Sequence, residues 1–271
     1  MKQEDNYKIR NWVEDLPKKG VITFSIEEVY KLFPSISKRG TANALLRLVN
    51  KGKILSVWKG FYVVIPIEYA HKGVVPPIVY INQLMEYLQR QYYIGLLDAA
   101  AFYAAAHQRP QVFTVITGLP SVRASEKKGI KMKFITKKNI PTSLLIQKKT
   151  KSGYVLVSSP ELTALDLILY KKEIGGINRA ATVLNELAEE LNFRDMDISI
   201  FDNTPVAVVQ RLGYLLEELD YSELADDLLH KTKVAGILFR KSPLKTGKNC
   251  EDCEYSAKWK IIINEEIEID E

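Results

Sequence analysis

The first seventy residues carry hydrophobic positions at helical spacing, followed by two short β-type runs. Residues 5–16 predict a first helix, because apolar side chains recur every three or four positions (Ile9, Trp12, Val13 and Leu16). The Pro-Lys-Lys-Gly sequence at residues 17–20 predicts where this helix ends.

A second helix is predicted to begin after Ser25. Ser25 and Glu28 have the spacing of a capping box, in which the serine hydroxyl accepts from the Glu28 amide and the glutamate reaches back. Phe24 and Val29 have the spacing of a hydrophobic staple across the same turn. Pro34 is expected to close the helix.

A third helix is predicted over residues 37–51, with Ser37 as its N-cap. At helical periodicity one face carries apolar side chains and is expected to pack on the first two helices (Ala42, Leu45, Leu46 and Val49). Arg39, Asn43 and Arg47 form a second row at i, i+4 and i+8, with Gly40 and Asn50 beside it.

This polar row has the composition of a helix face that reads the major groove of double-stranded DNA. Arginine suits guanine and asparagine suits adenine, and Gly40 would let the backbone come close to the bases. Lys38 and Thr41 are expected at the margins, placed for phosphate oxygens. An exposed helix face that binds no ligand often has the same composition, and many winged-helix domains bind protein instead of DNA.

Two β-type runs, residues 53–58 and 61–65, follow Gly52, which is expected to end the third helix. They predict a hairpin that turns at Lys59 and Gly60. Three helices followed by a hairpin is the order of a winged helix-turn-helix, and Lys59 would then lie over an adjacent groove or phosphate.

The pattern changes twice in the rest of the chain. Residues 78–93 and 95–107 predict helices, and residues 112–117, 131–136, 143–147 and 154–157 predict strands. The apolar run at residues 144–146 indicates a strand buried on both faces. From Ser159 the pattern predicts four helices, two of them opened by Ser159-Pro160 and Thr204-Pro205, and residues 259–263 a final strand.

The predicted fold class is therefore α+β, with two domains. Residues 1–70 are expected to form a winged helix-turn-helix. Residues 71–271 are expected to form a C-terminal domain with a mixed α/β part at 71–157 and a mostly helical bundle at 158–271.

The charge is distributed unevenly along the 271 residues. Residues 1–69 carry 12 Lys and Arg against 7 Asp and Glu, residues 70–157 carry 13 against 3, and residues 158–271 carry 13 against 23. A basic first half indicates a polyanionic partner. Beyond the basic N-terminal residues, the middle segment carries a second basic patch. Its charge suits contacts with DNA phosphates, although a solubilising surface has the same charge. The second basic patch includes Arg123, Lys127, Lys128, Lys131, Lys133, Lys137, Lys138, Lys148, Lys149 and Lys151.

Enzymatic and metal-dependent chemistry is not indicated. Cys250 and Cys253 have zinc-ligand spacing but no second cysteine pair, so neither a zinc site nor a disulfide framework is expected. His107 is expected to cap a helix end rather than act as a base. Asp166 is expected to make a structural hydrogen bond within an apolar helix.

A nuclease would need clustered carboxylates, and residues 70–157 offer few (Glu86, Asp98 and Glu126). Nucleotide-binding and hydrolase motifs are absent, so we expect no cofactor, no metal and no enzyme. The sequence begins without a signal-peptide pattern and contains no membrane-spanning apolar run, so a cytoplasmic protein is expected.

Three blocks in this order resemble the AbiEi antitoxins of type IV toxin–antitoxin systems. The first is residues 37–52 with the hairpin residues 59–62, the second is residues 92–103 with 112–117, and the third is residues 158–167 with 175–181. A helix-turn-helix block alone is shared by many regulators, whereas the three together are more specific.

The resemblance implies an autorepressor of an abortive-infection, phage-defence operon that binds inverted repeats in its own promoter. It also implies a C-terminal domain that assists DNA binding and counteracts a co-encoded nucleotidyltransferase-like toxin, AbiEii, without requiring a stable complex. The DNA-reading role falls on residues 37–47 and on Lys59. The alternative is a ligand-responsive winged-helix regulator unrelated to a toxin.

Overall fold

The computed structural model describes residues 2–106, 110–248 and 251–269, which form a mixture of helices and several sheets. The chain divides into two compact units. The first unit consists of residues 1–92, 111–137 and 147–156, and the second of residues 93–110, 138–146 and 157–271. None of the helices in the described ranges combines the length and the apolar composition that a membrane span requires.

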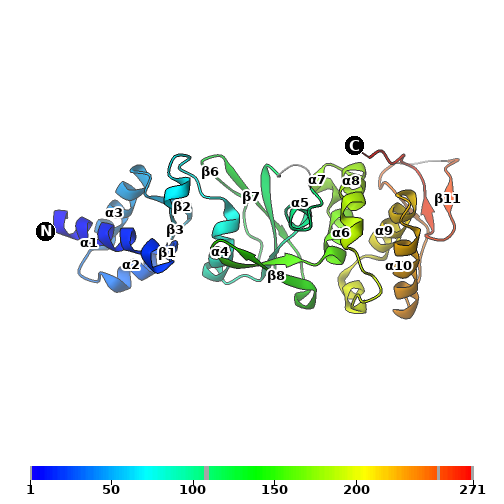
Figure 1. The fold of residues 1–271 in the computed structure, drawn as a ribbon, viewed down its shortest axis with the longest axis horizontal. Helices are drawn as coiled ribbons and strands as arrows, with labels where there is room; N and C mark the ends of the chain where they lie inside the picture. Colours follow the sequence, from blue (N-terminus) through cyan, green and yellow to red (C-terminus); the bar gives the residue numbers. More distant parts are fainter. Residues whose placement is uncertain (1, 107–109, 249–250, 270–271) are drawn as a thin grey trace. The chain divides into compact units, whose positions relative to one another are not determined.

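The first unit begins with three helices and a small sheet (Figure 1). The sheet is antiparallel with strand order β1-β3-β2, and Phe24 lies opposite Tyr62 in its register. Along the chain the elements are α1 (Lys2–Asp15), β1 (Thr23–Ser25), α2 (Ile26–Leu32), α3 (Lys38–Asn50), β2 (Ile54–Trp58) and β3 (Phe61–Val64).

Local hydrogen bonds fix where α2 and α3 begin. The Ser25 hydroxyl accepts from the Glu28 amide at 3.2 Å, and the Ser25 amide donates to the Glu28 carboxylate at 2.6 Å, which confirms the predicted capping box. The Ser37 hydroxyl accepts from the Gly40 amide at 3.1 Å, which confirms Ser37 as the N-cap of α3.

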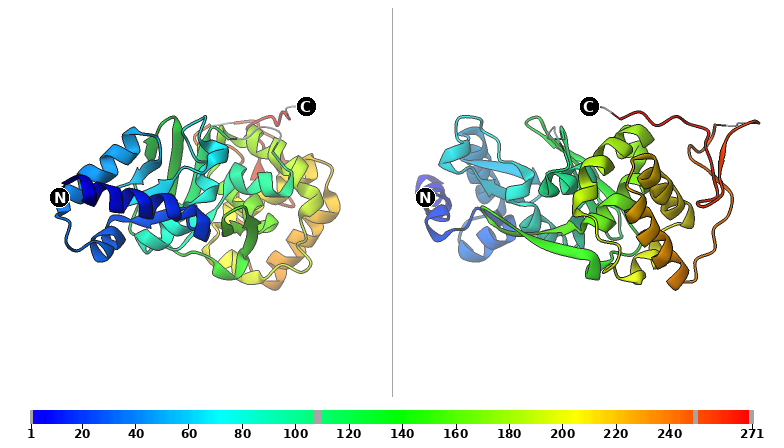
Figure 2. Two further views of the ribbon diagram at one scale, coloured as in Figure 1. Left: turned by 60° about the vertical axis from the view of Figure 1, so that its left-hand side comes forward. Right: turned by 45° about the vertical axis from the view of Figure 1, so that its right-hand side comes forward.

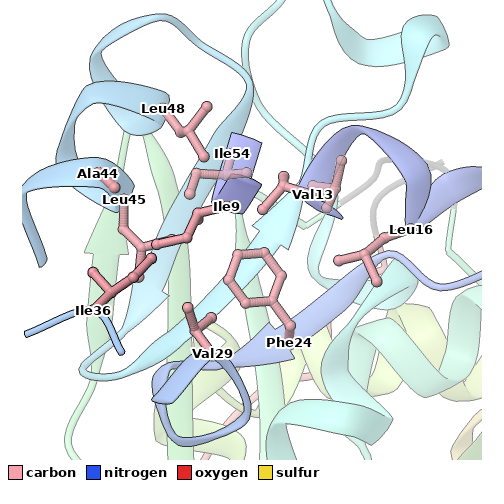
Figure 3. Close-up of a cluster of buried hydrophobic side chains, with 11 residues drawn as sticks. Ile9, Val13, Leu16, Phe24, Val29, Ile36, Ala44, Leu45, Leu48 and Ile54 are labelled. Carbon is pink, nitrogen blue, oxygen red and sulfur yellow. The ribbon is translucent and has the colours of Figure 1, made fainter. Parts of the chain in front are cut away.

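One hydrophobic cluster holds these elements together. Side chains from α1, α2, α3, β1 and β2 point toward one another around the Phe24 ring (Figure 3). Trp12 packs edge-on against Phe24 at 5.1 Å between ring centroids, and Tyr62 stacks on Phe24 at 5.4 Å. Burial of this many aromatic and aliphatic groups is the main stabilising contribution to this part of the fold.

The phase of the buried face of α3 differs from the prediction. The side chains that α3 buries are Thr41, Ala44, Leu45 and Leu48, whereas Ala42 and Leu46 are exposed. Residues 41, 44, 45 and 48 also satisfy helical spacing, so the sequence allowed both choices. Packing against Ile9 and Ile54 in the cluster selects the observed one.

The remainder of the first unit adds one helix, α4 (Ile81–Leu88), and the strands β5 (Val112–Thr117), β6 (Ser125–Lys127) and β7 (Ile130–Thr136). β5 and β7 are parallel neighbours, and β6 pairs antiparallel with β7 across the Lys128-Gly129 turn. These strands belong to a six-stranded sheet of order β6-β7-β5-β4-β9-β8, in which β4 (Tyr92–Ile94) pairs parallel to β9 (Gly153–Ser158) at Ile94 and Val157.

Two predictions for the middle segment are wrong. Residues 92 and 93, predicted as the end of a helix over 78–93, belong instead to the strand β4, which lies between β5 and β9 in the sheet. The strand β8 (Leu145–Thr150) lies at the sheet edge and leaves Ile146 exposed, so it is not buried on both faces. The predicted strands at residues 112–117 and 131–136 are confirmed by β5 and β7.

The second unit is dominated by helices, and α9 and α10 run side by side in Figures 1 and 2. Its helices are α5 (Leu96–Ala100), α6 (Pro160–Leu169), α7 (Lys171–Ile174), α8 (Ile177–Leu187), α9 (Val206–Glu218) and α10 (Ser222–Val234). Short strands follow, namely β10 (Ser242–Pro243), β11 (Tyr255–Ser256) and β12 (Ile261–Ile262), with β12 between the other two.

Short 3-10 helices connect the larger elements of both units. They are η1 (Pro17–Lys19), η2 (Ile67–Tyr69), η3 (Pro77–Val79), η4 (Ala101–Tyr103), η5 (Thr142–Leu144), η6 (Ala188–Glu190) and η7 (Ile198–Asn203). The predicted helix starts at Ser159-Pro160 and Thr204-Pro205 agree with α6 and α9, and Ser159 caps α6 through the Leu162 amide.

Buried polar groups at two places in the second unit are hydrogen-bonded. The Arg211 guanidinium donates to the Pro243 and Leu244 carbonyls, and burial lowers its pKa. The Tyr93 hydroxyl donates to the Asp166 carboxylate at 2.6 Å, which confirms the structural hydrogen bond expected for Asp166. Burial, and then the Asp166 charge, raises the pKa of Tyr93 well above its usual value.

Candidate nucleic-acid interface

The exposed face of α3 gathers the polar row predicted from the sequence. Arg39, Asn43 and Arg47 are all exposed, and Asn50 continues the same face at the end of the helix. No hydrogen bond or ion pair within the described residues engages the side chains of Arg39, Asn43 or Arg47. Three long polar side chains on one helix face therefore remain free to contact a ligand.

The polar residues at the start of α3 differ in exposure, and one of them is not placed as predicted. Thr41 is fully buried, its hydroxyl oxygen included, so a contact between this side chain and a phosphate is excluded. The prediction for Thr41 is wrong because Thr41 replaces Ala42 on the buried face. Ser37 and Lys38 are exposed, and the Lys38 ammonium lies 5.8 Å from the centre of the Tyr30 ring.

Gly40 has a structural reason to be glycine. A Cβ added there would lie 3.1 Å from Ile36 Cγ2 and 3.2 Å from the Ser37 hydroxyl that caps the helix. A side chain at residue 40 would therefore press on the cap. Close approach of the Gly40 backbone to a base stays a prediction.

The β2–β3 turn is held in place by α4. Lys59 is exposed at this turn, while its carbonyl accepts from the Tyr87 hydroxyl at 3.2 Å. Gly60 adopts φ +76°, and a Cβ at residue 60 would lie 2.7 Å from the Tyr87 hydroxyl oxygen. The Phe61 and Tyr87 rings are 5.2 Å apart. The turn thus presents the Lys59 side chain from a fixed backbone.

Sequence reasoning missed Tyr87, because a tyrosine on an amphipathic helix gives no sign of a partner 28 residues away. Burial, and then the charge of Glu27, raises the Tyr87 pKa. The hydroxyl therefore stays protonated at neutral pH and keeps donating to Lys59.

The β6–β7 hairpin carries most of the second basic patch. Arg123, Lys127, Lys128 and Lys131 are exposed on it or just before it, and Lys133 is half-buried. Two of these lysines have weak partners within the unit. Lys128 Nζ lies 3.4 Å from the Gly73 carbonyl, and Lys131 Nζ lies 4.0 Å from a Glu126 carboxylate oxygen, both at exposed positions.

The structure places this hairpin against β2, which the sequence did not predict. The Ser125 hydroxyl lies 3.5 Å from the Val57 carbonyl, and the Trp58 and Phe134 rings meet edge-on at 6.1 Å. The basic hairpin and the β2–β3 hairpin are therefore neighbours within the first unit.

The other basic residues of the second basic patch differ in exposure and in ion pairing. Lys137 is buried, so it does not belong to an exposed patch. Lys151 lies 3.8 Å from Glu68 in an exposed ion pair, and Lys138 and Lys149 are exposed. The surface that we call the basic hairpin therefore consists of Arg123, Lys127, Lys128, Lys131 and Lys133.

Metal chemistry finds no support in the described residues, where no three His, Cys, Asp or Glu side chains lie together as a metal site. Cys253 is disulfide-bonded, and a disulfide sulfur is not a thiolate ligand. Cys250 and His107 lie outside the described residues.

Comparisons with known proteins identify part of the chain. Residues 93–218 match the family model described as the AbiEi antitoxin C-terminal domain. No curated protein matches the chain in sequence.

Among solved structures, the RV2827C protein from Mycobacterium tuberculosis is similar, with a TM-score of 0.65 and 15% identity over 92% of this chain and 89% of that chain. At this identity the likeness concerns the fold alone. An antigenic nucleotidyltransferase-like protein from Paracoccidioides brasiliensis is less similar, with a TM-score of 0.36 and 11% identity over 55% of this chain and 90% of that chain.

Proposed function

Because the chain belongs to the AbiEi antitoxin family through residues 93–218, we propose that it is a DNA-binding autorepressor and antitoxin of a type IV toxin–antitoxin system. In this proposal residues 1–70 are a winged helix-turn-helix that binds inverted repeats in the promoter of its own operon. Residues 71–271 are the antitoxin domain, and the protein itself carries out no catalysis.

The observation that carries the DNA-binding part is the exposed row of Arg39, Asn43 and Arg47 on α3, with which no described residue forms a hydrogen bond or ion pair. The element order α1-β1-α2-α3-β2-β3 and the sheet order β1-β3-β2 support it, because winged helices present their third helix to the major groove with a β hairpin beside it. In that docking, Arg39 and Asn43 read bases, and Ser37 and Lys38 contact phosphates at the helix start.

The basic hairpin supplies affinity without sequence choice. Its lysines lie on a strand pair that adjoins β2, and in this proposal they contact phosphates that flank the groove occupied by α3. Each lysine that neutralises a phosphate releases counterions and steepens the salt dependence of binding. Lys59 is the corresponding contact from the β2–β3 turn.

The antitoxin part rests on the family match over residues 93–218. Its functional partner in this proposal is a co-encoded AbiEii-like nucleotidyltransferase toxin. A type IV antitoxin can oppose its toxin without binding it, so a stable complex between the two is not required.

A gel-shift titration tests the DNA-binding part. The full chain is titrated against the DNA upstream of its own gene and against a scrambled duplex of the same composition, each at two salt concentrations. We expect a clear preference for the promoter and a footprint with two symmetric halves. Equal, salt-sensitive binding to both duplexes would show that the protein binds DNA without sequence specificity. No binding to either duplex would contradict the DNA-binding function.

Co-expression tests the antitoxin part independently. The neighbouring nucleotidyltransferase-like gene is induced in cells with and without this chain, which is expressed from an unrelated promoter. We expect growth arrest only in its absence. Arrest in both strains would contradict the antitoxin function while leaving the repressor function standing.

A further inference from the structure

Two apolar side chains lie on the exposed face of α3 among the polar ones. Leu46 is 56% exposed, and Ala42 is exposed one turn before it. Helical residues four apart lie one above the other on the same face. Ala42 and Leu46 therefore form a short apolar strip, which runs beside the row of Arg39, Asn43 and Arg47.

This strip is separate from the hydrophobic cluster of the N-terminal helices. That cluster takes Ala44, Leu45 and Leu48 from α3, and neither Ala42 nor Leu46 belongs to it. A single exposed leucine on a protein surface needs no explanation by itself. What distinguishes Leu46 is its place in the middle of the one face of α3 whose arginines and asparagine have no partner among the described residues.

In the major groove the apolar group that distinguishes one base from the others is the C5 methyl of thymine. We propose that Leu46, with Ala42 beside it, contacts thymine methyl groups in the operator and makes Leu46 a specificity-determining residue. This inference rests on the DNA-binding function proposed above. It adds a thymine to the site, next to the adenine that suits Asn43 and the guanine that suits Arg39.

The neighbours of the strip favour DNA over a protein as its occupant. One leucine and one alanine offer far less apolar surface than the core of a stable protein interface. Arg39, Asn43 and Arg47 lie along the strip, and a partner that seats it must also accept hydrogen bonds from two guanidinium groups. The edges of the major groove supply both kinds of contact.

Removing the thymine methyl group tests the contact directly. Deoxyuridine keeps the pairing of thymidine but lacks the C5 methyl, so operators with every thymine replaced compete against the natural operator for the protein. Burial of one methyl-sized group corresponds to about fourfold in affinity. We expect the wild-type protein to prefer the thymine operator by about fourfold for each contacted methyl, and single replacements to locate the positions.

The variants assign the effect to Leu46. In Leu46→Ala the preference for thymine should fall toward one, whereas Leu46→Met, of similar volume, should keep most of it. Leu32→Ala is the matched control, because Leu32 is similarly exposed on α2, and it should leave the preference unchanged. Arg39→Ala should weaken binding to both operators and leave their ratio unchanged.

The outcomes separate this inference from the function beneath it. A wild-type protein that prefers its promoter but binds the thymine and deoxyuridine operators equally overturns the role of Leu46 alone. The same holds if Leu46→Ala keeps the wild-type ratio. A wild-type protein that does not distinguish its promoter from scrambled DNA overturns the proposed function, and the inference falls with it.

Discussion

The two units of this chain use their polar side chains in opposite ways. In the second unit Arg211, Gln210 and Asn264 are buried, and each donates hydrogen bonds to backbone carbonyls that the fold encloses. In the first unit Arg39 and Asn43 extend from an exposed helix face and form no hydrogen bond or ion pair with another described residue.

Charge follows the same division. The first unit carries 23 Lys and Arg against 9 Asp and Glu, whereas the second unit carries 15 Lys and Arg against 24 Asp and Glu. Polar groups enclosed by the second unit stabilise its structure, because a buried donor or acceptor without a partner is costly. Exposed polar side chains of the first unit contribute little to the stability of the fold and are available to bind a polyanion. Substitutions in the two units should therefore alter different properties.

The largest effect on stability is expected from Arg211→Leu. It removes the donor for the Pro243 and Leu244 carbonyls and should lower the free energy of unfolding by about 3 kcal/mol. Arg194→Leu is the control, since Arg194 is exposed in its ion pair with Asp227 and should change stability by less than about 1 kcal/mol. Denaturant unfolding measures both, and equal stability of the two variants would contradict the structural role of Arg211.

The largest effect on DNA binding is expected from Arg39→Ala and Asn43→Ala. Each should weaken operator binding by about 1–3 kcal/mol and relax the preference at one base position, because the hydrogen bonds to that base disappear. The unfolding free energy should stay within about 0.5 kcal/mol of the wild type, since neither side chain contacts the core. Arg10→Ala, which removes an exposed arginine from α1, serves as the control. Unchanged binding profiles for both variants would refute the assignment of α3.

A smaller effect on stability is expected from Tyr93→Phe. The change removes the hydroxyl that donates to the buried Asp166 carboxylate and should cost about 1–2 kcal/mol. The raised pKa of Tyr93 means that its contribution is fully present below the ordinary tyrosine pKa of about 10 and is lost as the pH rises above that value. The stability of Tyr93→Phe should therefore decline less steeply above about pH 10.

The control for that change is Tyr154→Phe at an exposed tyrosine, which should alter neither the stability nor its pH dependence. If Tyr93→Phe were as stable as Tyr154→Phe at neutral pH, the hydrogen bond to Asp166 would contribute nothing measurable.

The smallest effect on sequence preference is expected from the basic hairpin. Replacing Lys127, Lys128 and Lys131 by alanine should weaken binding to promoter and scrambled DNA alike. It should also reduce the slope of log affinity against log salt by about one for each phosphate that the protein no longer neutralises. Lys172→Ala with Lys233→Ala removes exposed lysines from the second unit as a control. An unchanged affinity and slope would show that the hairpin lysines are only a solvated surface.

Features encoded by neighbouring residues were predictable from the sequence. The capping box at Ser25 and Glu28 and the N-cap at Ser37 follow from contacts within one helical turn, and the structure has both. The exposed row of Arg39, Asn43 and Arg47 followed from helical spacing and is also present.

Features decided by distant contacts were not predictable. Thr41 and Ala42 are both small, and only packing against the other helices decides which of them α3 buries. β1 and β6 have three residues each, too few to show a period, and they exist because β3 and β7 pair with them. The hydrogen bond between Tyr87 and the Lys59 carbonyl joins elements that no local pattern relates.

The central claim is that α3 serves DNA binding and is not needed for antitoxin activity. One bacterial strain tests it most directly. The strain carries a reporter behind the chain's own promoter and an inducible copy of the neighbouring toxin gene. The wild-type chain and the Arg39→Ala/Asn43→Ala double variant are expressed at equal levels from an unrelated promoter. We predict that the variant loses repression of the reporter but still protects growth. Full repression by the variant would contradict the assignment of DNA reading to α3.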